Sequence, residues 1–234
     1  MIHFFTFDGK SSRDCGLVIS GGGTFGAPER DAEQVEIPGR NGALTISRNR
    51  FKNITVSYSA SLRRDFAENA AALRAWLLGG EGYRRLEDTY HPDSFRMARF
   101  SGPLDFETGF LNRTGEVALS FDCKPQRFLK SGELAAAYTA PAVLYNDGFP
   151  ALPLIKVMGT GAGNLYAGGV TVRILALDGY LYLDSDTQNA YKGTLNQNSA
   201  IRAPEFPVLQ PGKNTVSWDG GVAAVEITPR WWTV

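Results

Sequence analysis

Hydrophobic and polar residues alternate along three segments in the first third of the chain, at 34–37, 43–46 and 54–60. A period of two is typical of β-strands that bury one face. The first two segments are separated by Pro-Gly at 38–39 and Asn-Gly at 41–42. Proline fixes φ and glycine tolerates positive φ, so these dipeptides favour a sharp turn. The pattern predicts a strand pair joined by a tight turn and then a third strand, each with one buried face.

The next stretch changes to a helical period. Asp65 can cap the first turn, and Glu68 lies three residues further on, a spacing typical of a capping box. The apolar stripe at helical spacing consists of Phe66, Ala70, Leu73 and Leu77. Gly-Gly at 79–80 favours a left-handed cap at the end. We predict one helix over 65–78 that packs on a sheet, because an isolated helix of this length is marginal in water.

The composition of the chain changes after Pro125. An alanine run and Pro141 make 133–145 a predicted linker. Beyond it, short apolar segments alternate with turn signals, which favours a β-sandwich. The sequence therefore predicts an N-terminal domain over 1–132, which contains the helix, and a C-terminal domain over 146–234.

Composition and charge narrow the function classes. The 234 residues are 43% hydrophobic and 21% charged, which indicates a folded chain. The 24 acidic and 24 basic residues balance, whereas a dedicated nucleic-acid binder is usually markedly basic. Low net charge also favours association with other copies or partners. Because no apolar run approaches ~20 residues and the first residues do not resemble a signal peptide, we expect no membrane insertion and folding in a cytoplasm.

Cysteine and histidine usage favours no catalytic or metal site. Cys15 and Cys123 lie in or beside apolar segments, so buried free thiols are favoured, with a bridge between them left open. His3 and His91 do not lie beside a candidate nucleophile in the sequence. The Gly-x-Ser-x-Gly, His-Glu-x-x-His and Cys-x-x-Cys motifs are absent. We therefore expect no catalytic residue, no cofactor and no metal site.

Three further patterns carry weak chemical signals. The glycine-rich segment 159–164 has its third glycine one residue early for a dinucleotide fingerprint and precedes a strand-like segment, so it predicts a loop. The acidic segment 184–187 lacks the glycine and distal glutamate of an EF-hand loop, so a short turn is favoured. A carboxylate pair could serve a glycosidase. The candidates by residue type are Glu81, Glu87, Asp88 and Asp105, for which a solvated surface is the favoured interpretation.

Two surfaces are candidates for contacts between subunits or with partners. The basic segment 47–53 is either a solvated hairpin tip or a docking site for an acidic surface, and it predicts contacts through Arg48, Arg50 and Lys52. The helix face opposite the apolar stripe carries little charge, so either a loop of the same chain or a neighbouring subunit covers it. The candidate contacts on this face are Ala71, Ala75 and Leu78.

Two adjacent tryptophans, Trp231 and Trp232, lie near the C-terminus. Neighbouring side chains of a strand point to opposite faces, so one is expected to pack inside and the other to be exposed. An exposed tryptophan suits a protein contact, which we favour, or the face of a sugar ring. The alternative function is therefore a carbohydrate-binding module, with further stacking residues at Tyr180, Tyr182 or Tyr191.

The order of several motifs resembles the distal tail proteins of long-tailed bacteriophages. Ile-Pro-Gly-Arg-Asn-Gly at 37–42 precedes paired strands and one helix, and Leu-Ser-Phe-Asp-Cys-Lys-Pro at 119–125 ends a later strand. Tyr-Asn-Asp-Gly-Phe-Pro at 145–150 and Pro-Leu-Ile-Lys-Val at 153–157 resemble the start of that family's second domain. Pro-Arg-Trp-Trp at 229–232 resembles its closing strand, so the likeness spans most of the chain.

This resemblance implies both a fold and a function. The implied fold is mostly β, with one α-helix packed on an N-terminal β-sandwich-like domain and a galectin-like or jelly-roll β-sandwich at the C-terminus. The implied function is a non-enzymatic structural hub at the virion tail tip, assembled in the host cytoplasm. The first domain would form a homo-hexameric ring joining the tail tube protein to the tail-associated fibre or lysin protein. The second domain would hold baseplate or receptor-binding proteins.

Overall fold

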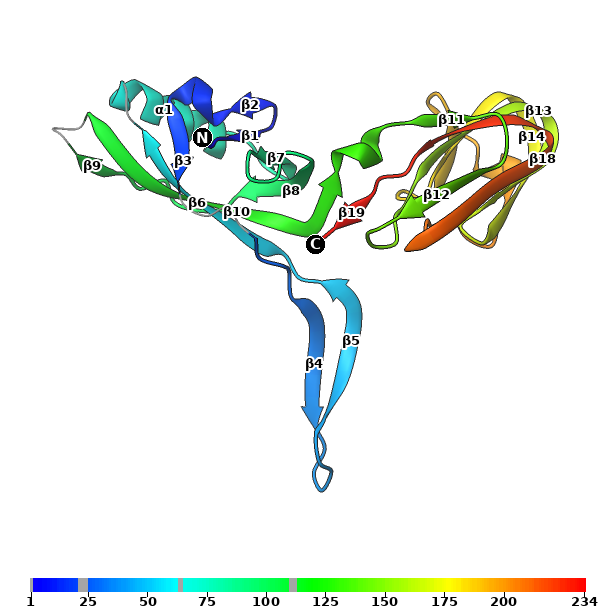
Figure 1. Ribbon diagram of the computed structural model, residues 1–234, viewed down its shortest axis with the longest axis horizontal. Helices are drawn as coiled ribbons and strands as arrows, with labels where there is room; N and C mark the ends of the chain where they lie inside the picture. Colours follow the sequence, from blue (N-terminus) through cyan, green and yellow to red (C-terminus); the bar gives the residue numbers. More distant parts are fainter. Residues whose placement is uncertain (1, 21–24, 63–64, 110–112) are drawn as a thin grey trace. The chain divides into compact units, whose positions relative to one another are not determined.

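The computed structural model describes residues 2–20, 25–62, 65–109 and 113–234. The chain divides into two compact units. The first, which we call the N-terminal unit, consists of Met1–Arg127 together with Val234. The second, which we call the C-terminal unit, consists of Phe128–Thr233. Both units are built mainly from β-strands, and the described residues contain one α-helix, in the N-terminal unit (Figure 1). The predicted mostly β fold class is therefore confirmed.

The N-terminal unit is organised around one sheet. Its strands run in the order β2-β1-β7-β8-β10-β6-β3, and β9 pairs with β10. Their bounds are β1 Phe5–Phe7, β2 Lys10–Ser11, β3 Leu17–Ser20, β6 Ile54–Leu62, β7 Arg84–Asp88, β8 Ser94–Phe100, β9 Glu107–Gly109 and β10 Thr114–Leu129. A 3₁₀ turn at Ser12–Cys15 joins β2 to β3.

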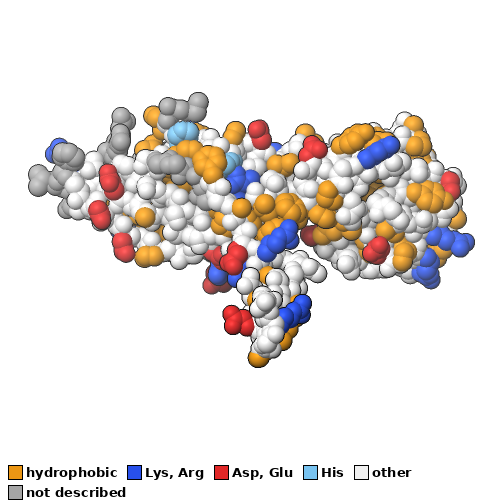
Figure 2. All heavy atoms as spheres, turned by 60° about the horizontal axis from the view of Figure 1, so that its bottom comes forward, with side chains coloured by type: hydrophobic (Ala, Val, Ile, Leu, Met, Phe, Trp, Pro, Cys, Tyr) orange, Lys and Arg blue, Asp and Glu red, His pale blue; other side chains and the backbone are white. Residues whose placement is uncertain are grey.

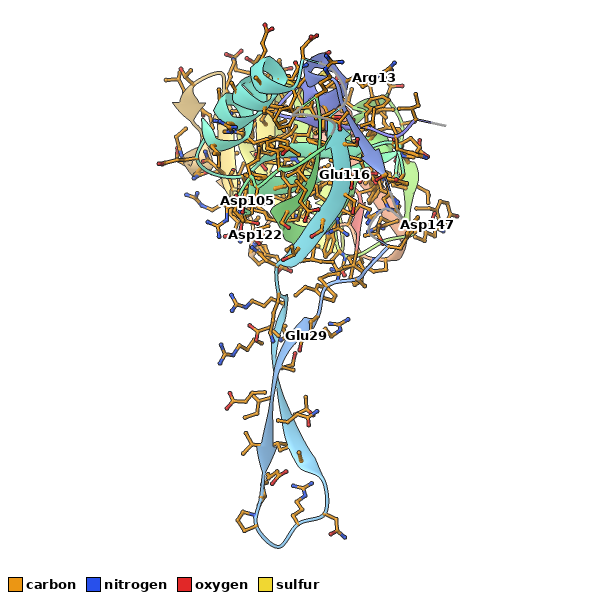
Figure 3. The ribbon with its side chains drawn as sticks, turned by 90° about the vertical axis from the view of Figure 1, so that its left-hand side faces the viewer. Arg13, Glu29, Asp105, Glu116, Asp122 and Asp147 are labelled. Atoms are coloured by element: carbon orange, nitrogen blue, oxygen red, sulfur yellow. The ribbon has the colours of Figure 1, made fainter. Side chains whose placement is uncertain are left out.

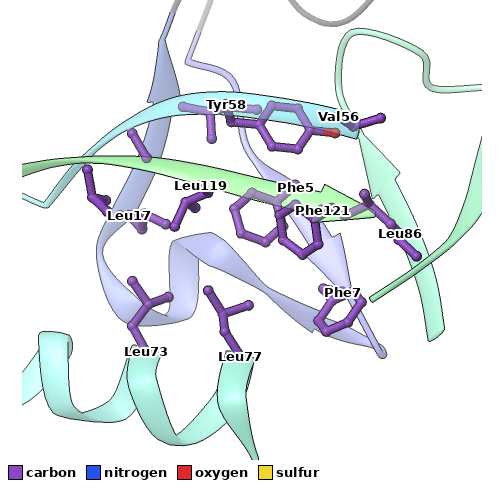
Figure 4. Close-up of a cluster of buried hydrophobic side chains, with 14 of the residues drawn as sticks. Phe5, Phe7, Leu17, Val56, Tyr58, Leu73, Leu77, Leu86, Leu119 and Phe121 are labelled. Carbon is purple, nitrogen blue, oxygen red and sulfur yellow. The ribbon is translucent and has the colours of Figure 1, made fainter. Parts of the chain in front are cut away.

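The core of this unit lies between the sheet and the helix α1 (Phe66–Leu78). Alternate residues of β6 and β10 point into it, and α1 adds Leu73 and Leu77, which point toward the sheet in Figure 4. Phe5 and Phe121 are fully buried and meet edge to face, with ring centroids 5.5 Å apart. Because α1 buries its stripe on this sheet, the predicted position of the helix is confirmed.

Both predicted caps of α1 are wrong. Asp65 adopts a left-handed conformation, with φ of 43°, and its side chain makes no capping hydrogen bond. An N-cap carboxylate reaches the first-turn N–H groups from an extended backbone, which Asp65 does not have. At the other end Gly79 is right-handed, with φ of −76°. Glycine is needed there for space, since a Cβ on Gly79 would lie 2.2 Å from the carbonyl oxygen of Ala75.

A long β-hairpin forms the remaining part of the N-terminal unit. Strands β4 (Arg30–Glu36) and β5 (Ala43–Phe51) pair with each other in a separate two-stranded sheet, visible as a projecting arm in Figure 1. The predicted strand pair and turn are confirmed. The predicted hairpin tip at 47–53 is wrong, because β5 continues to Phe51 and the turn lies at 37–42. The predicted burial of one face of this strand pair is also wrong, as described below.

The C-terminal unit contains an eight-stranded sheet. The strand order is β11-β18-β13-β14-β15-β16, with β12 also paired to β18 and β17 to β14. The bounds are β11 Ala136–Tyr138, β12 Ala142–Asn146, β13 Leu154–Ala167, β14 Val170–Asp184, β15 Asn189–Lys192, β16 Leu195–Asn196, β17 Ile201–Arg202 and β18 Gly212–Thr228, followed by β19 at Trp232–Thr233. The segment 133–145 that we predicted as a linker thus carries β11 and β12, both paired to β18.

The glycine-rich segment 159–164 is part of β13, so the predicted loop is wrong. The register of β13 against β14 shifts between Gly161 and Gly163, which marks a bulge. A Cβ on Gly159 would lie 2.0 Å from the carbonyl oxygen of Gly221 on β18. Glycine therefore lets two strand backbones approach closely, and no helix follows to bind a pyrophosphate.

The two cysteines are buried and free. Burial raises the pKa of the Cys123 thiol to about 12, so this group stays protonated at neutral pH. The favoured prediction of buried free thiols is confirmed. Among the described residues, no helix is long and apolar enough to cross a membrane.

Replacing Leu73 by alanine tests how α1 is held. Leu73 is fully buried, so the loss of its side chain leaves a cavity and should lower the unfolding free energy by ~2–5 kcal/mol. Leu78 is 59% exposed at the end of the same helix, and Leu78→Ala should change the unfolding free energy by less than about 0.5 kcal/mol. Urea unfolding followed by tryptophan fluorescence measures both. Equal effects of the two substitutions would contradict the described packing.

Candidate assembly surfaces

The strand register sorts the hairpin side chains onto two different faces. Val35 lies opposite Leu44, and Glu33 lies opposite Ile46. Directly opposed residues share a face, and side chains along a strand alternate between faces. Val35, Leu44 and Ile46 therefore share one face with Glu33, and we call it the apolar hairpin face. The other face carries small or polar residues, namely Gln34, Glu36, Ala43, Thr45 and Ser47.

The apolar hairpin face is open to solvent. Leu44 is 47% exposed and Ile46 is 48% exposed, and every residue from position 43 to 50 is exposed. Figure 2 shows hydrophobic, acidic and basic side chains on the projecting arm. A lone two-stranded hairpin is marginally stable in water. An apolar stripe along such a hairpin is therefore a candidate contact surface, since its burial would stabilise both the contact and the hairpin.

The three cations that we predicted as partner contacts each pair with a carboxylate across the hairpin. Arg48 lies 3.8 Å from Glu33, Arg50 lies 2.7 Å from Asp31, and Lys52 lies 3.3 Å from Glu29. Glu29 is labelled along the arm in Figure 3. The hydrogen bond from Arg50 lowers the pKa of Asp31. Surface pairs of this kind add little stability, but they leave the arm with neighbouring charges of both signs rather than a basic patch.

A polar cluster fixes the root of the hairpin. Asn53, directly before β6, donates to Asp122 on β10 at 2.9 Å. The same carboxylate accepts hydrogen bonds from Tyr83 at 3.2 Å and from Arg99 at 2.8 Å. Burial acts to raise the pKa of Asp122, but the bonds from Arg99, Asn53 and Tyr83 outweigh it and hold the pKa below its usual range. The arm therefore leaves the sheet from an anchored position.

The outer face of α1 is the second open apolar surface of the N-terminal unit. The predicted contact residues Ala71, Ala75 and Leu78 are all exposed. Trp76, at the edge of the buried stripe, donates its indole N–H to the backbone oxygen of Phe7 at 3.2 Å. The outer face is thus presented by a helix whose inner side is fixed on the sheet.

The expected exposed tryptophan does not occur. Trp231 is half-buried and packs against the core of the C-terminal unit. Trp232 is also half-buried, stacks on Phe149 with ring centroids 4.8 Å apart, and donates its indole N–H to the backbone oxygen of Pro150 at 2.9 Å. Trp231 lies outside β19, so the alternation of strand faces does not apply to this pair, and Phe149 in the segment before β13 packs on the second ring.

The structure instead gathers three tyrosines on one face of the C-terminal sheet. Tyr182 on β14 stacks on Tyr191 of β15 at 5.2 Å, and Tyr180 meets Tyr182 edge to face at 5.7 Å. The ammonium group of Lys156 lies 5.3 Å from the Tyr180 ring, and that of Lys192 lies 5.5 Å from it. The sequence analysis named these tyrosines as alternative stacking residues beside the two tryptophans. Their grouping follows from a strand register that composition alone does not give.

The titratable residues considered for chemistry have structural partners. His3 stacks on Tyr90 at 4.2 Å, and His91 meets Phe25 at 4.9 Å. Asp184 is bound by Arg230 at 2.6 Å. Within the described ranges, no group of three histidine, cysteine or acidic residues is arranged to hold a metal ion.

The four carboxylates considered for a glycosidase do not line a common pocket in the part of the chain that the structure describes. Asp105 lines a cleft of about 300 Å³ with Glu107 and Glu116, and Figure 3 labels Asp105 and Glu116. Asp88 lines a different cavity.

Comparison with sequence models of protein families and with curated proteins finds no match for this chain. Comparison with solved structures finds clear similarity in fold. The chain matches a structure described as phage SPP1 Dit (gp 19.1), a hub adsorption apparatus of phages that infect Gram-positive hosts, with a TM-score of 0.77 and 13% identity. That match covers 97% of this chain and 98% of the other.

Two structures of a phage baseplate in its activated conformation are also similar. The phage P2 baseplate with Ca matches with a TM-score of 0.52 and 9% identity, over 97% of both chains. The phage p2 baseplate with Sr matches with a TM-score of 0.55 and 8% identity, over 97% of this chain and 96% of that one. The resemblance to phage distal tail proteins that the motifs predicted is thus confirmed in the fold.

Replacing Asp122 by asparagine tests the hairpin root. Losing a charged acceptor of three hydrogen bonds should lower the unfolding free energy by about 1–2 kcal/mol at neutral pH. Because the folded pKa is depressed, this contribution is present above the unfolded value of about 3.9 and is lost as the pH falls from there through the folded pKa. The wild-type advantage measured by urea unfolding should therefore shrink below about pH 4.

The matched control is Asp178→Asn. Asp178 is 99% exposed and pairs only with Lys192 among the described ion pairs, so its substitution should have little effect at any pH. A wild-type advantage over the Asp122 variant that does not depend on pH would argue against this role of the carboxylate.

Proposed function

We propose that this chain is a structural hub of the tail tip of a long-tailed phage, in which copies of the chain assemble into a closed ring. The similarity to a Dit hub and to phage baseplates extends over nearly the whole chain and supports the tail-tip role. The observation that carries the ring is the apolar hairpin face, whose Leu44 and Ile46 are about half exposed. A second copy is the occupant that we infer for this face.

The physical reason for a ring is closure. A contact between two different surfaces of identical subunits repeats around an axis, and when it closes no subunit keeps an open apolar face. The arm of one copy would lay Val35, Leu44 and Ile46 on its neighbour, and the intrachain ion pairs would border that contact. The family resemblance implies six copies.

The remaining surfaces suit the partners that the resemblance implies. The ring would join the tail tube protein to the tail-associated fibre or lysin protein, with the outer face of α1 as a further contact through Ala71, Ala75 and Leu78. The C-terminal unit would hold baseplate or receptor-binding proteins at the virion tail tip. None of these roles requires catalysis.

The double substitution Leu44→Glu with Ile46→Glu tests the ring. It removes two apolar contacts and places two charges in the proposed interface, so association should weaken by roughly 100-fold or more. Light scattering on the size-exclusion eluate and negative-stain images should show rings for the wild type and monomers for the variant. Circular dichroism should remain that of the wild type, since both residues lie outside the core.

Thr45→Glu is the matched control, because Thr45 lies between the two residues and points to the other face. This variant should assemble as the wild type does. Wild-type chains that stay monomeric even with the tube and fibre proteins present would overturn the proposal. Assembly by the double variant would move the interface away from the hairpin.

A second candidate function is carbohydrate binding by the C-terminal unit. The observation that favours it is the cluster of Tyr180, Tyr182 and Tyr191, whose rings could stack on sugar faces. A groove of about 620 Å³ borders Tyr180 and Lys192. The half-buried Trp231 and Trp232 are poorer stacking surfaces, since each already has its own packing partner.

A glycan array probed with the full chain tests this candidate. Binding should be specific for one type of glycan. The affinity should fall at least ~10-fold in Tyr182→Ala, because stacking of a ligand ring on an aromatic side chain contributes about 1–3 kcal/mol. Tyr145→Ala is the control, since Tyr145 is 67% exposed on β12 and belongs to no described aromatic pair. Absence of binding across the array would remove this candidate and leave the hub proposal unaffected.

A further inference from the structure

The turn of the β4–β5 hairpin contains a dipeptide that lies outside the apolar hairpin face. Asn41 and Gly42 follow the last opposed pair of the hairpin, Glu36 and Ala43, at the tip of the projecting arm (Figure 1). Both residues are exposed. They form the single Asn-Gly dipeptide of the sequence. Asparagine is a chemically labile residue, most of all when glycine follows it, so this turn is a candidate site of deamidation.

Both reacting groups of this dipeptide are free in the part of the chain that the structure describes. The one backbone hydrogen bond described within the turn runs from the N–H of Arg40 to the backbone oxygen of Ile37, at 3.1 Å. No described hydrogen bond uses the side-chain amide of Asn41 or the backbone N–H of Gly42. The nitrogen of Gly42 can therefore approach the amide carbon of Asn41 without first breaking a hydrogen bond.

The surroundings of Gly42 leave room for this approach. Gly42 has a φ of 82°, and a Cβ built at this position would meet no atom within 4 Å. Glycine itself has no Cβ, so its nitrogen is not shielded from the side chain of the residue before it. The turn can therefore change its backbone angles during the attack without displacing a packed neighbour.

Two other asparagines each lack one of these conditions. Asn49 is exposed on the same hairpin, but it lies within β5 and is followed by Arg50, a residue with a Cβ. Asn198 is followed by the small residue Ser199. Its side-chain oxygen, however, accepts a hydrogen bond from the N–H of Ala190 at 2.6 Å, which fixes the amide. Asn49 and Asn198 are therefore internal references for the reactivity of Asn41.

We propose that Asn41 is a site of spontaneous deamidation in the free chain. The nitrogen of Gly42 gives its proton to a base in the solvent and attacks the side-chain amide carbon of Asn41. The new N–C bond replaces the bond to the amide nitrogen, which takes up a proton and leaves as ammonia, and a cyclic succinimide remains. Water then opens the ring at either carbonyl carbon, which yields aspartate or isoaspartate. The reaction consumes only water, and this site is independent of the proposed hub function.

Either product changes the tip of the arm. Both products place a carboxylate next to Arg40 in the sequence, and isoaspartate also lengthens the backbone of the turn by a methylene group. Turn geometry sets the register of a β-hairpin. The isoaspartate form should therefore hold Val35 opposite Leu44 less firmly than the unmodified chain does. Deamidation would thus loosen the hairpin as the chain ages.

Peptide mapping of the full chain by mass spectrometry, after incubation in warm and mildly alkaline buffer, tests the proposal. Asn41 should deamidate at least ~10-fold faster than Asn49 and Asn198. The rate should rise with pH, because the attacking nitrogen must lose its proton. The same chain in guanidinium chloride gives the rate for an unfolded turn, and the folded chain should deamidate at Asn41 within ~10-fold of that rate.

Labelling by an isoaspartyl methyltransferase supplies a second readout. It should label the aged wild type and leave aged Asn41→Gln unlabelled, because the longer glutamine side chain forms its ring far more slowly. Asn41 is not one of the described non-glycine residues with positive φ, so glutamine suits its backbone. The proposal is overturned if Asn41 reacts no faster than the two reference asparagines, or more than ~10-fold more slowly in the folded chain than in denaturant. Equal labelling of aged Asn41→Gln and aged wild type would also overturn it.

Discussion

An apolar face on a hairpin that has no core of its own is the constraint on which the rest of the structure depends. Leu44 and Ile46 stay about half exposed because β4 and β5 pair only with each other among the described strands. Apolar surface in water is unfavourable, and a two-stranded sheet gains too little from its own contacts to offset it. Such an arm would gain stability if another molecule covered its apolar face. We therefore propose that the molecule acts through its contact surfaces rather than through catalysis.

The other parts of the N-terminal unit support that arm. The sheet and α1 enclose a core rich in aromatic rings, and the hydrogen bonds to Asp122 tie the hairpin root to the same sheet. Because the root is fixed, the direction of the arm is set in the free chain, and the proposed association would lose less conformational entropy. The C-terminal unit has its own core around Ile155, Leu165 and Leu183, so it can present a separate surface.

The sequence pattern predicted the positions of strands and of the helix better than it predicted the burial and the contacts of their side chains. A period of two located β4, β5 and β6 correctly, but it cannot tell a face covered by the same chain from one covered by another, so burial was wrong for the hairpin and right for Val56 and Tyr58. Residue type suggested a cap at Asp65, whereas φ decides whether a side chain can cap. The tyrosine cluster and the Asp122 hydrogen bonds depend on strand register, which pairs residues far apart in sequence.

The central claim is that another copy of the chain covers the apolar hairpin face. Amide hydrogen exchange of residues 43–51, compared between dilute free chain and assembled ring, tests it most directly. The account predicts fast exchange along this strand in the free chain and strong protection on assembly, while the core strands β6 and β10 exchange alike in both states. Unchanged exchange of the hairpin in an assembled ring would contradict it.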